Sequence, residues 1–203
     1  AYSKLVLATG ARAFVPPVAG DASDDIKTLN SLQEYRHLRE RMMQGERVLV
    51  LGGGLIGTEI AHDLAVAGKQ VSVCDPSAQL LANLLPEFAA QRLAETLQTL
   101  SCELLLNNTL EMLQRLPHGV RATFTNGEAR EFDHVICAAG LRPNSELAAQ
   151  AGLNVERGIV VDSQLRTSDP DIYALGDVAQ IDGRLWPFLQ PISQCAAALA
   201  KTI

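Results

Sequence analysis

A cluster of glycines marks the segment of this chain with the clearest capacity for chemistry. Gly52, Gly54 and Gly57 fit the spacing G-x-G-x-x-G and directly follow an apolar run, residues 47–51. Glycines at these places allow a tight turn, close approach of the backbone to a pyrophosphate and close packing of the following helix. The N–H groups and the dipole at the start of that helix favour phosphate. The predicted dinucleotide site consists of Gly52, Gly53, Gly54, Leu55, Ile56 and Gly57; the alternative is a glycine turn without a ligand.

An acidic residue follows at the distance that such a site requires. Residues 70–74 form the next apolar run, and Asp75 ends it 23 residues after Gly52. A carboxylate there accepts a hydrogen bond from an adenosine ribose 2′-OH and repels a 2′-phosphate. Since no arginine occurs in residues 76–78, the pattern favours NAD(H) over NADP(H). Asp75 could instead be an ordinary turn residue at the end of a strand.

The elements that must position these residues alternate along the chain. Short apolar runs ending in glycine occur at 4–10, 47–52, 134–140 and 171–176, which is typical of buried parallel strands. Helices are expected from a capping box at Ser31 to about Met43, from the glycine turn to Gly68, and over 86–100. Residues 109–132 alternate between apolar and polar and contain the turn Asn126-Gly127, which predicts a small antiparallel meander. Residues 14–21 and 142–144 are expected to be linkers.

Composition narrows the class of protein. The 203 residues are 47% hydrophobic and 20% charged, which is typical of a chain that folds around a core. The net charge of −6 argues against a nucleic-acid partner, and no apolar run approaches the ~18 residues of a membrane helix. The four cysteines form no C-x-x-C pair, so neither a metal site nor a dithiol is expected. A chain with so few cysteines is expected to be a cytoplasmic protein. Because it starts on a strand without an initiator methionine, the chain is expected to be part of a longer protein.

Four motifs in a fixed order support a family resemblance. They are residues 7–10, the glycine turn, residues 140–144 and residues 174–177. Over its whole length the chain resembles the FAD/NAD(P) pyridine nucleotide-disulfide oxidoreductase superfamily. The segments Phe14-Val15-Pro16-Pro17 and 186–192 make it most similar to the rubredoxin reductase branch.

The resemblance implies an α/β fold in which one domain is inserted into another. Residues 28–144 would form a three-layer, Rossmann-like NAD-binding domain with a β-meander. Residues 1–27 and 145–203 would belong to an incomplete FAD-binding domain. The N-terminal βαβ unit of that domain, with its own glycine fingerprint, and the family's C-terminal domain are absent from this sequence.

The resemblance also assigns roles to residues outside the glycine turn. Glu59 would lie near the junction of nicotinamide and flavin, and Gly140 would pass close to NAD. Asp177 would meet the ribityl chain of FAD, and a helix starting near Pro191 would point its N-terminus at the flavin. The residues implied on the FAD side are Thr9, Gly10, Gly176, Asp177, Pro191 and Ile192. Asp177 could instead be a cap or turn residue, and Glu59 a solvated helix residue.

The function that follows from the resemblance is electron transfer. The protein would pass electrons from NADH through FAD to a rubredoxin-type iron centre, flavorubredoxin, in nitric oxide detoxification, with no acid–base residue needed for catalysis. The absence of C-x-x-C from residues 28–144 excludes the thioredoxin reductase type. Two alternatives stay open. One is a non-catalytic NAD-binding sensor or regulatory module, and the other is an NADH-dependent ferredoxin or disulfide reductase of the same superfamily.

Overall fold

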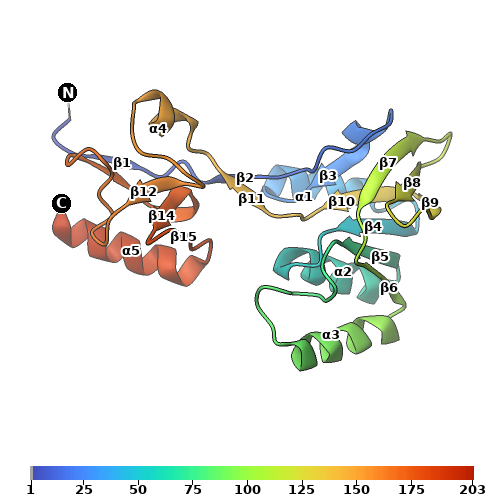
Figure 1. Cartoon of the computed structure of the whole chain (residues 1–203). Helices are drawn as coiled ribbons and strands as arrows, with labels where there is room; N and C mark the ends of the chain where they lie inside the picture. The colour runs from blue at the N-terminus through green and yellow to red at the C-terminus, as the bar shows by residue number, and fades with distance from the viewer. Residues whose placement is uncertain (1) are drawn as a thin grey trace. The chain divides into compact units, whose positions relative to one another are not determined.

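The computed structural model describes residues 2–203 and divides into two compact units (Figure 1). The second unit is the continuous segment Ala13–Gly140, and the first contains the described residues up to Arg12 together with Leu141–Ile203. Among the described residues, no helix is long and apolar enough to cross a membrane.

The second unit contains the expected α/β elements. In chain order they are the short 3-10 helix η1 (Ser23–Asp25), β3 (Ile26–Thr28), α1 (Leu32–Arg41), β4 (Arg47–Leu51), α2 (Leu55–Val66), β5 (Gln70–Asp75), α3 (Glu87–Thr99), β6 (Cys102–Leu106), β7 (Leu110–Arg115), β8 (Val120–Phe124), β9 (Ala129–Phe132) and β10 (His134–Cys137). Five strands form a parallel sheet in the order β3-β10-β4-β5-β6. The chain leaves β4 toward β5 on one side and returns through β10 on the other. In open parallel sheets, ligands bind at such a switch point, at the carboxyl ends of the strands.

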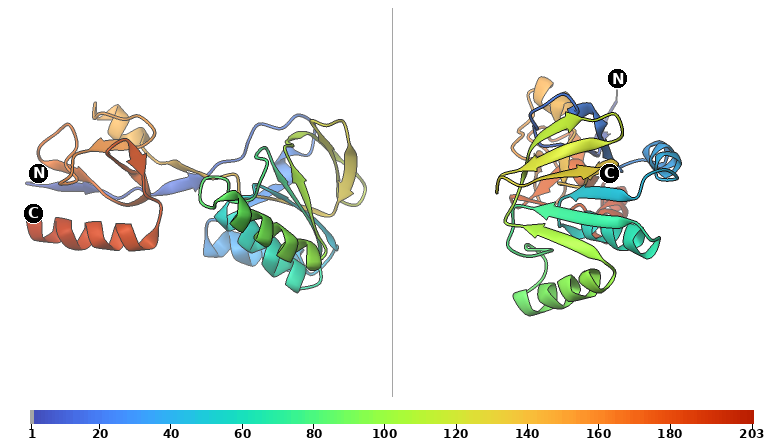
Figure 2. Two further views of the ribbon diagram at one scale, coloured as in Figure 1. Left: turned by 60° about the horizontal axis from the view of Figure 1, so that its bottom comes forward. Right: turned by 90° about the vertical axis from the view of Figure 1, so that its right-hand side faces the viewer.

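The sheet is the middle of three layers, as predicted (Figure 2). Val48 and Val50 of β4 pack with residues of α1, α2 and α3 on one face. Leu49 and Leu51 pack on the other face with the antiparallel meander β7-β8-β9. Because successive side chains of a strand point to opposite faces, burial on both sides explains the uninterrupted apolar run of β4.

Local signals set the ends of these elements. The Ser31 hydroxyl accepts a hydrogen bond from the Glu34 backbone N–H at 3.1 Å, so the predicted capping residue does begin α1. The helix ends at Arg41 rather than near Met43. The turn at Asn126-Gly127 also forms: Gly127 has φ +84° and donates from its N–H to the Phe124 carbonyl at 2.9 Å.

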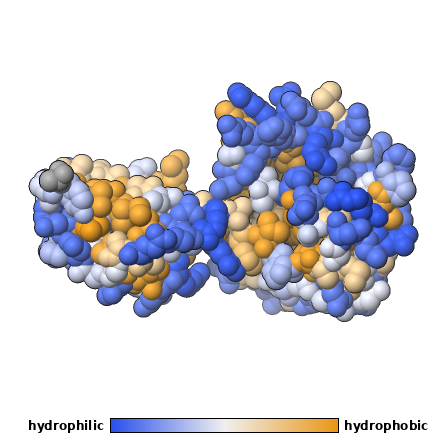
Figure 3. Space-filling model, turned by 90° about the horizontal axis from the view of Figure 1, so that it is seen from above, coloured by the Kyte–Doolittle hydropathy of each residue, from blue (hydrophilic) through white to orange (hydrophobic). Residues whose placement is uncertain are grey.

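The first unit is smaller and combines short strands with α-helices. Its elements are β1 (Leu5–Leu7), β2 (Ala11–Ala13), β11 (Leu141–Pro143), α4 (Glu146–Gln150), β12 (Ile159–Val161), β13 (Ile172–Ala174), the 3-10 helix η2 (Gly176–Val178), β14 (Ala179–Ile181), β15 (Arg184–Leu185) and α5 (Leu189–Thr202). The first and last of the predicted apolar runs become β1 and β13, which pair in parallel. Apolar side chains also remain on the surface (Figure 3). Trp186, Phe188 and Leu189 are among the exposed apolar residues of this unit.

The boundaries of the units differ from the predicted domain limits of 28 and 144. Backbone bonds join Ala19 to Glu111 and Leu113 of the meander, and β3 is an edge strand of the parallel sheet, so residues 13–27 pack with the second unit. At the other end, the boundary between the units lies after Gly140, beside the linker expected at residues 142–144, but this segment is regular in structure. Leu141–Pro143 form β11, which pairs with β2, and the Asn144 N–H donates to the Gly10 carbonyl at 2.9 Å.

Candidate functional site

The first position of the turn after β4 has room for glycine alone. Gly52 has φ +109°, which L side chains rarely adopt, and its N–H donates to the Cys74 carbonyl at 2.8 Å. A Cβ on Gly52 would lie 2.5 Å from the Ala138 carbonyl oxygen of the segment after β10. The turn therefore lies against both neighbouring strands at the switch point of the sheet.

The third glycine of the fingerprint brings helix α2 close to this turn. A Cβ on Gly57 would lie 1.9 Å from the Gly52 carbonyl oxygen, a distance that no side chain tolerates. Thr58, which is buried, donates from its hydroxyl to the Gly53 carbonyl at 3.3 Å and from its N–H to the Gly54 carbonyl at 2.9 Å. The packing that the sequence predicted for Gly57 is thus present in the structure.

The middle of the turn is open. Gly54 is the N-cap of α2, with no side-chain cap, and a Cβ built on it would meet nothing within 4 Å. Leu55 and Ile56, the first residues of the helix, are exposed. The first N–H groups of a helix have no partner within it, and here they border empty space beside a backbone without a side chain. This arrangement fits a pyrophosphate.

Asp75 lies next to that space. One oxygen of its half-buried carboxylate accepts the Gly53 N–H at 2.6 Å, and the other accepts the Ser77 N–H at 2.7 Å. Asp75 thus has the bonds of a turn residue, which was the alternative to a ribose-binding role. The two roles are compatible because each carboxylate oxygen has a second lone pair. Gln79, four residues after Asp75, donates from its side-chain amide to the Leu85 carbonyl at 3.0 Å.

The remaining residues predicted on the NAD side lie in the same unit. Glu59 is exposed on the second turn of α2. Gly140 follows β10 with φ +107°, and a Cβ there would also meet nothing within 4 Å. Its carbonyl accepts the Phe14 N–H at 2.9 Å. Because β10 runs parallel to β4 with Cys137 beside Leu51, the segment that ends at Gly140 leaves the sheet at the same edge as the glycine turn.

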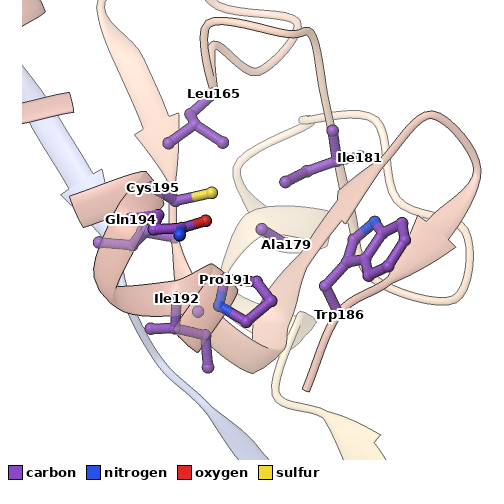
Figure 4. A pocket seen from close by; sticks show the side chains of 10 residues that line it. Leu165, Ala179, Ile181, Trp186, Pro191, Ile192, Gln194 and Cys195 are labelled. Atoms are coloured by element: carbon purple, nitrogen blue, oxygen red, sulfur yellow. The ribbon is translucent and has the colours of Figure 1, made fainter. Parts of the chain in front are cut away.

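The first unit contains a pocket of about 290 Å³ that includes three of the predicted FAD-side residues. Gly176, Pro191 and Ile192 belong to its lining. Residues from α5 face Ala179, Ile181 and Trp186 across the pocket (Figure 4). The lining residues that sequence reasoning missed are Leu165, Leu175, Ala179, Ile181, Trp186, Gln194 and Cys195. Most are ordinary apolar residues, so only their arrangement in space identifies them.

Three predicted FAD-side residues do not line this pocket. Asp177 is half-buried in η2, directly after Gly176, whose φ of +84° and open Cβ position leave the backbone accessible. Thr9 and Gly10 are bound to Asn144, which sequence reasoning did not assign to a site. The Thr9 hydroxyl donates to the Asn144 carbonyl at 2.7 Å, and the Asn144 side-chain amide donates to the Thr9 carbonyl at 2.9 Å.

The cysteines of the sheet are structural. Burial raises the pKa of the Cys74 thiol to about 12 and that of Cys102 to about 11, and it also raises the pKa of Cys137. Thiols with such pKa values stay protonated at neutral pH and are poor nucleophiles. The prediction that Cys74 and Cys137 pack as small apolar residues is confirmed by their burial.

The amino-acid sequence of the chain is similar to those of curated bacterial proteins. A protein from Vibrio vulnificus described as nitric oxide reductase FlRd-NAD(+) reductase is 54% identical over 202 residues. A protein with the same description from Salmonella gallinarum is 50% identical over 202 residues. Both alignments cover 100% of this chain and 53% of the relative. The chain thus spans about half the length of these curated relatives.

Solved structures agree with the sequence relatives. A ferredoxin reductase from Rhodopseudomonas palustris matches 98% of this chain and 52% of its own with a TM-score of 0.90 and 30% identity. An NAD-dependent persulfide reductase from A. fulgidus matches 99% of this chain and 39% of its own with a TM-score of 0.91 and 30% identity. The family model of the pyridine nucleotide-disulphide oxidoreductases matches residues 1–200. The chain therefore belongs to the pyridine nucleotide-disulphide oxidoreductase family, and the resemblance inferred from its motifs is confirmed.

Proposed function

We propose that the protein passes electrons from NADH through FAD to a rubredoxin-type iron centre, flavorubredoxin, in nitric oxide detoxification, and that it works in the cytoplasm. The observation that carries the NADH part is the open turn at Gly54 beside a carboxylate 2.6 Å from the Gly53 N–H. The acceptor follows from relatives that are 48–54% identical and described as FlRd-NAD(+) reductases.

The second unit would bind the nucleotide. The N–H groups at the start of α2 would hold the pyrophosphate, and the missing side chain at Gly54 would let the phosphates approach the backbone. Asp75 would accept the ribose hydroxyl through the lone pairs that its bonds to Gly53 and Ser77 leave unused. Glu59 and Gly140 would border the nicotinamide half. The proposed NAD(H) site is Gly52, Gly53, Gly54, Leu55, Ile56, Gly57, Glu59, Asp75 and Gly140.

The first unit would bind part of FAD. The apolar pocket beside the N-terminal half of α5 suits a flat aromatic ring, and the helix N-terminus near it favours negative charge. Asp177 would accept hydrogen bonds from the ribityl hydroxyls, and Thr9 and Gly10 would border the same cofactor. FAD, when bound, supplies the chemistry that links two-electron hydride transfer to single-electron release. The residues of this chain would orient the cofactor and exclude water.

The decisive experiment uses the full-length protein. Purified protein should show the absorbance of oxidised flavin, and anaerobic NADH should bleach it far more efficiently than NADPH. Reoxidation of the bleached protein by flavorubredoxin should then be fast. A colourless protein that still binds NAD⁺ would instead establish the sensor alternative, and comparable efficiency with NADH and NADPH would contradict the role of Asp75.

A ferredoxin acceptor is the second candidate. The specific observation in its favour is the match to the Rhodopseudomonas palustris ferredoxin reductase at 30% identity. The same assay separates the two: the NADH-reduced protein is offered flavorubredoxin and a [2Fe–2S] ferredoxin at equal concentration. Faster reduction of the ferredoxin would reverse the assignment of the partner.

A further inference from the structure

The short segment 107–109, between β6 and β7, is hydrogen-bonded to the end of β5, where Asp75 lies. The Asn108 N–H donates to the Asp75 carbonyl at 3.1 Å, and the Asn107 N–H donates to the Ser77 carbonyl at 3.0 Å. Asn107 has φ +54°, a conformation that asparagine tolerates better than most residues. These two bonds attach the segment to the backbone on both sides of Pro76, at the end of β5.

The Asn108 side chain ties the same segment to the meander. It is only 4% exposed, and its Oδ1 accepts three hydrogen bonds. The donors are the Thr109 N–H at 3.1 Å, the Thr125 hydroxyl at 2.8 Å and the Asn126 N–H at 3.3 Å. Thr125 and Asn126 lie in the turn that joins β8 to β9, so one buried oxygen links the hairpin turn to the segment behind Asp75.

The backbone carbonyl of Asn108 is used as well. It accepts the Cys74 thiol at 3.3 Å, so the residue contacts the end of β5 through both its N–H and its carbonyl. Beyond its own segment, Asn108 is therefore hydrogen-bonded to two parts of the described chain, the end of β5 and the hairpin turn. A buried network of this kind transmits displacement because its members have no water to replace a lost partner.

We propose that Asn108 is a positioning residue for the nucleotide ribose, through which the meander sets the preference for NADH. This inference rests on the proposed role of Asp75 as the acceptor of the ribose hydroxyl. Asp75 itself bonds Gly53 and Ser77, so a shift of the segment behind it alters the direction of its free lone pairs. Positioning to within about 0.5 Å is what such sites need. Asn108 acts through the backbone of Asp75, to which its own N–H donates, and through the adjoining bond from Asn107 to Ser77.

The test compares side chains at Asn108 in the full-length flavoprotein. Asn108→Ala removes the acceptor and is expected to raise the KM for NADH roughly ten- to hundredfold, since a misplacement of about 1 Å can have such an effect. It should leave kcat at saturating NADH within about twofold and lower the ratio of kcat/KM for NADH to that for NADPH. Asn108→Asp keeps an oxygen that can accept all three bonds and should restore most of the loss.

A matched control separates positioning from general loss of structure. Asn154 is exposed in the first unit, and its side chain has no hydrogen bond among the described contacts, so Asn154→Ala should leave both constants unchanged. Thermal unfolding of each variant gives the folded fraction. Should Asn108→Ala not fold, Asn108→Ser takes the same measurements and the same criteria.

Two outcomes overturn the proposal. One is an unchanged KM for NADH in folded Asn108→Ala protein, and the other is a fall of kcat equal for NADH and NADPH without a change in their ratio. Failure of the proposed function itself is recognised earlier, because the unmutated protein would then not oxidise NADH. The two failures are therefore distinguishable.

Discussion

Replacing Gly54 by valine should abolish nucleotide binding while leaving the fold intact. The backbone of Gly54, with φ −75° and ψ −173°, is extended and suits a β-branched residue. A Cβ there meets nothing within 4 Å, so no atom of the protein has to move. The helix loses a favourable N-cap residue, which costs about 1 kcal/mol at most.

The loss of binding should be much larger than the loss of stability. The valine side chain would fill the space in which phosphate oxygens approach the N–H groups of α2. Losing two charge-assisted hydrogen bonds, at roughly 1.5–3 kcal/mol each, weakens binding by roughly a hundredfold to ten-thousandfold. Calorimetric titration of the full-length protein with NAD⁺ measures the Kd, and thermal unfolding measures stability. An unchanged Kd in the folded variant would show that the pyrophosphate binds elsewhere.

Gly57→Ala is the matched comparison, in which the free energy of unfolding should fall much more than in Gly54→Val. Its Cβ would lie 1.9 Å from the Gly52 carbonyl oxygen, so α2 must move away from β4 by roughly 1 Å. Overpacking of this kind costs about 1–3 kcal/mol, or roughly 2–12 °C in Tm for a chain of this size. If Gly57→Ala were as stable as the unmutated protein, the close packing of helix and strand would be refuted.

Three further predictions concern other parts of the chain. The Arg47 guanidinium and the backbone N–H groups beside Asp133 hold the pKa of its carboxyl below the usual range. Asp133→Asn should therefore cost about 1–3 kcal/mol at pH 7, and this difference should begin to shrink as the pH falls below about 4 and continue to shrink toward the lower pKa of the folded state, as urea unfolding across pH would show. Cys74 and Cys102 should resist alkylation at pH 8 in the native state while the half-exposed Cys195 reacts, and equal labelling on mass spectrometry would contradict this. The 203-residue chain by itself should retain FAD poorly because it has one glycine fingerprint for two dinucleotides, and stoichiometric flavin after gel filtration would disprove this.

Much of the second unit could be predicted because its signals are local. The glycine spacing, the capping residue Ser31 and the turn at Asn126-Gly127 act over a few residues, and each does so in the structure. The apolar run of β4 predicted burial on both faces. In the structure the helices cover one face of the strand and the meander covers the other. Local chemistry and the three-layer fold agree, which explains why reasoning from sequence succeeded here.

The parts that could not be predicted depend on contacts between distant residues. The role of Asn108 was not predicted because nothing near it in sequence marks it as buried, and its partners Thr125 and Asn126 are 17 and 18 residues away. The second unit begins at Ala13 rather than at the predicted residue 28 because residues such as Ala19, which bonds to Leu113, pack with it. This pairing has no local signal in the sequence. Asn144 belonged to an expected linker but binds Thr9, 135 residues earlier. Each is a tertiary contact that overrides the local pattern.

The first unit is built from two stretches of the chain that the second unit separates, and this arrangement affects the order of folding. Its strands β1 and β13 pair Leu5 with Ile172, so the chain must close a loop that includes the whole of Ala13–Gly140. Closing roughly 130 flexible residues costs about 4 kcal/mol of chain entropy. The second unit is continuous, and its ends meet where the Phe14 N–H donates to the Gly140 carbonyl at 2.9 Å. Once that unit has folded, the loop is already closed, so the second unit should fold first and the first unit should form on its joined ends.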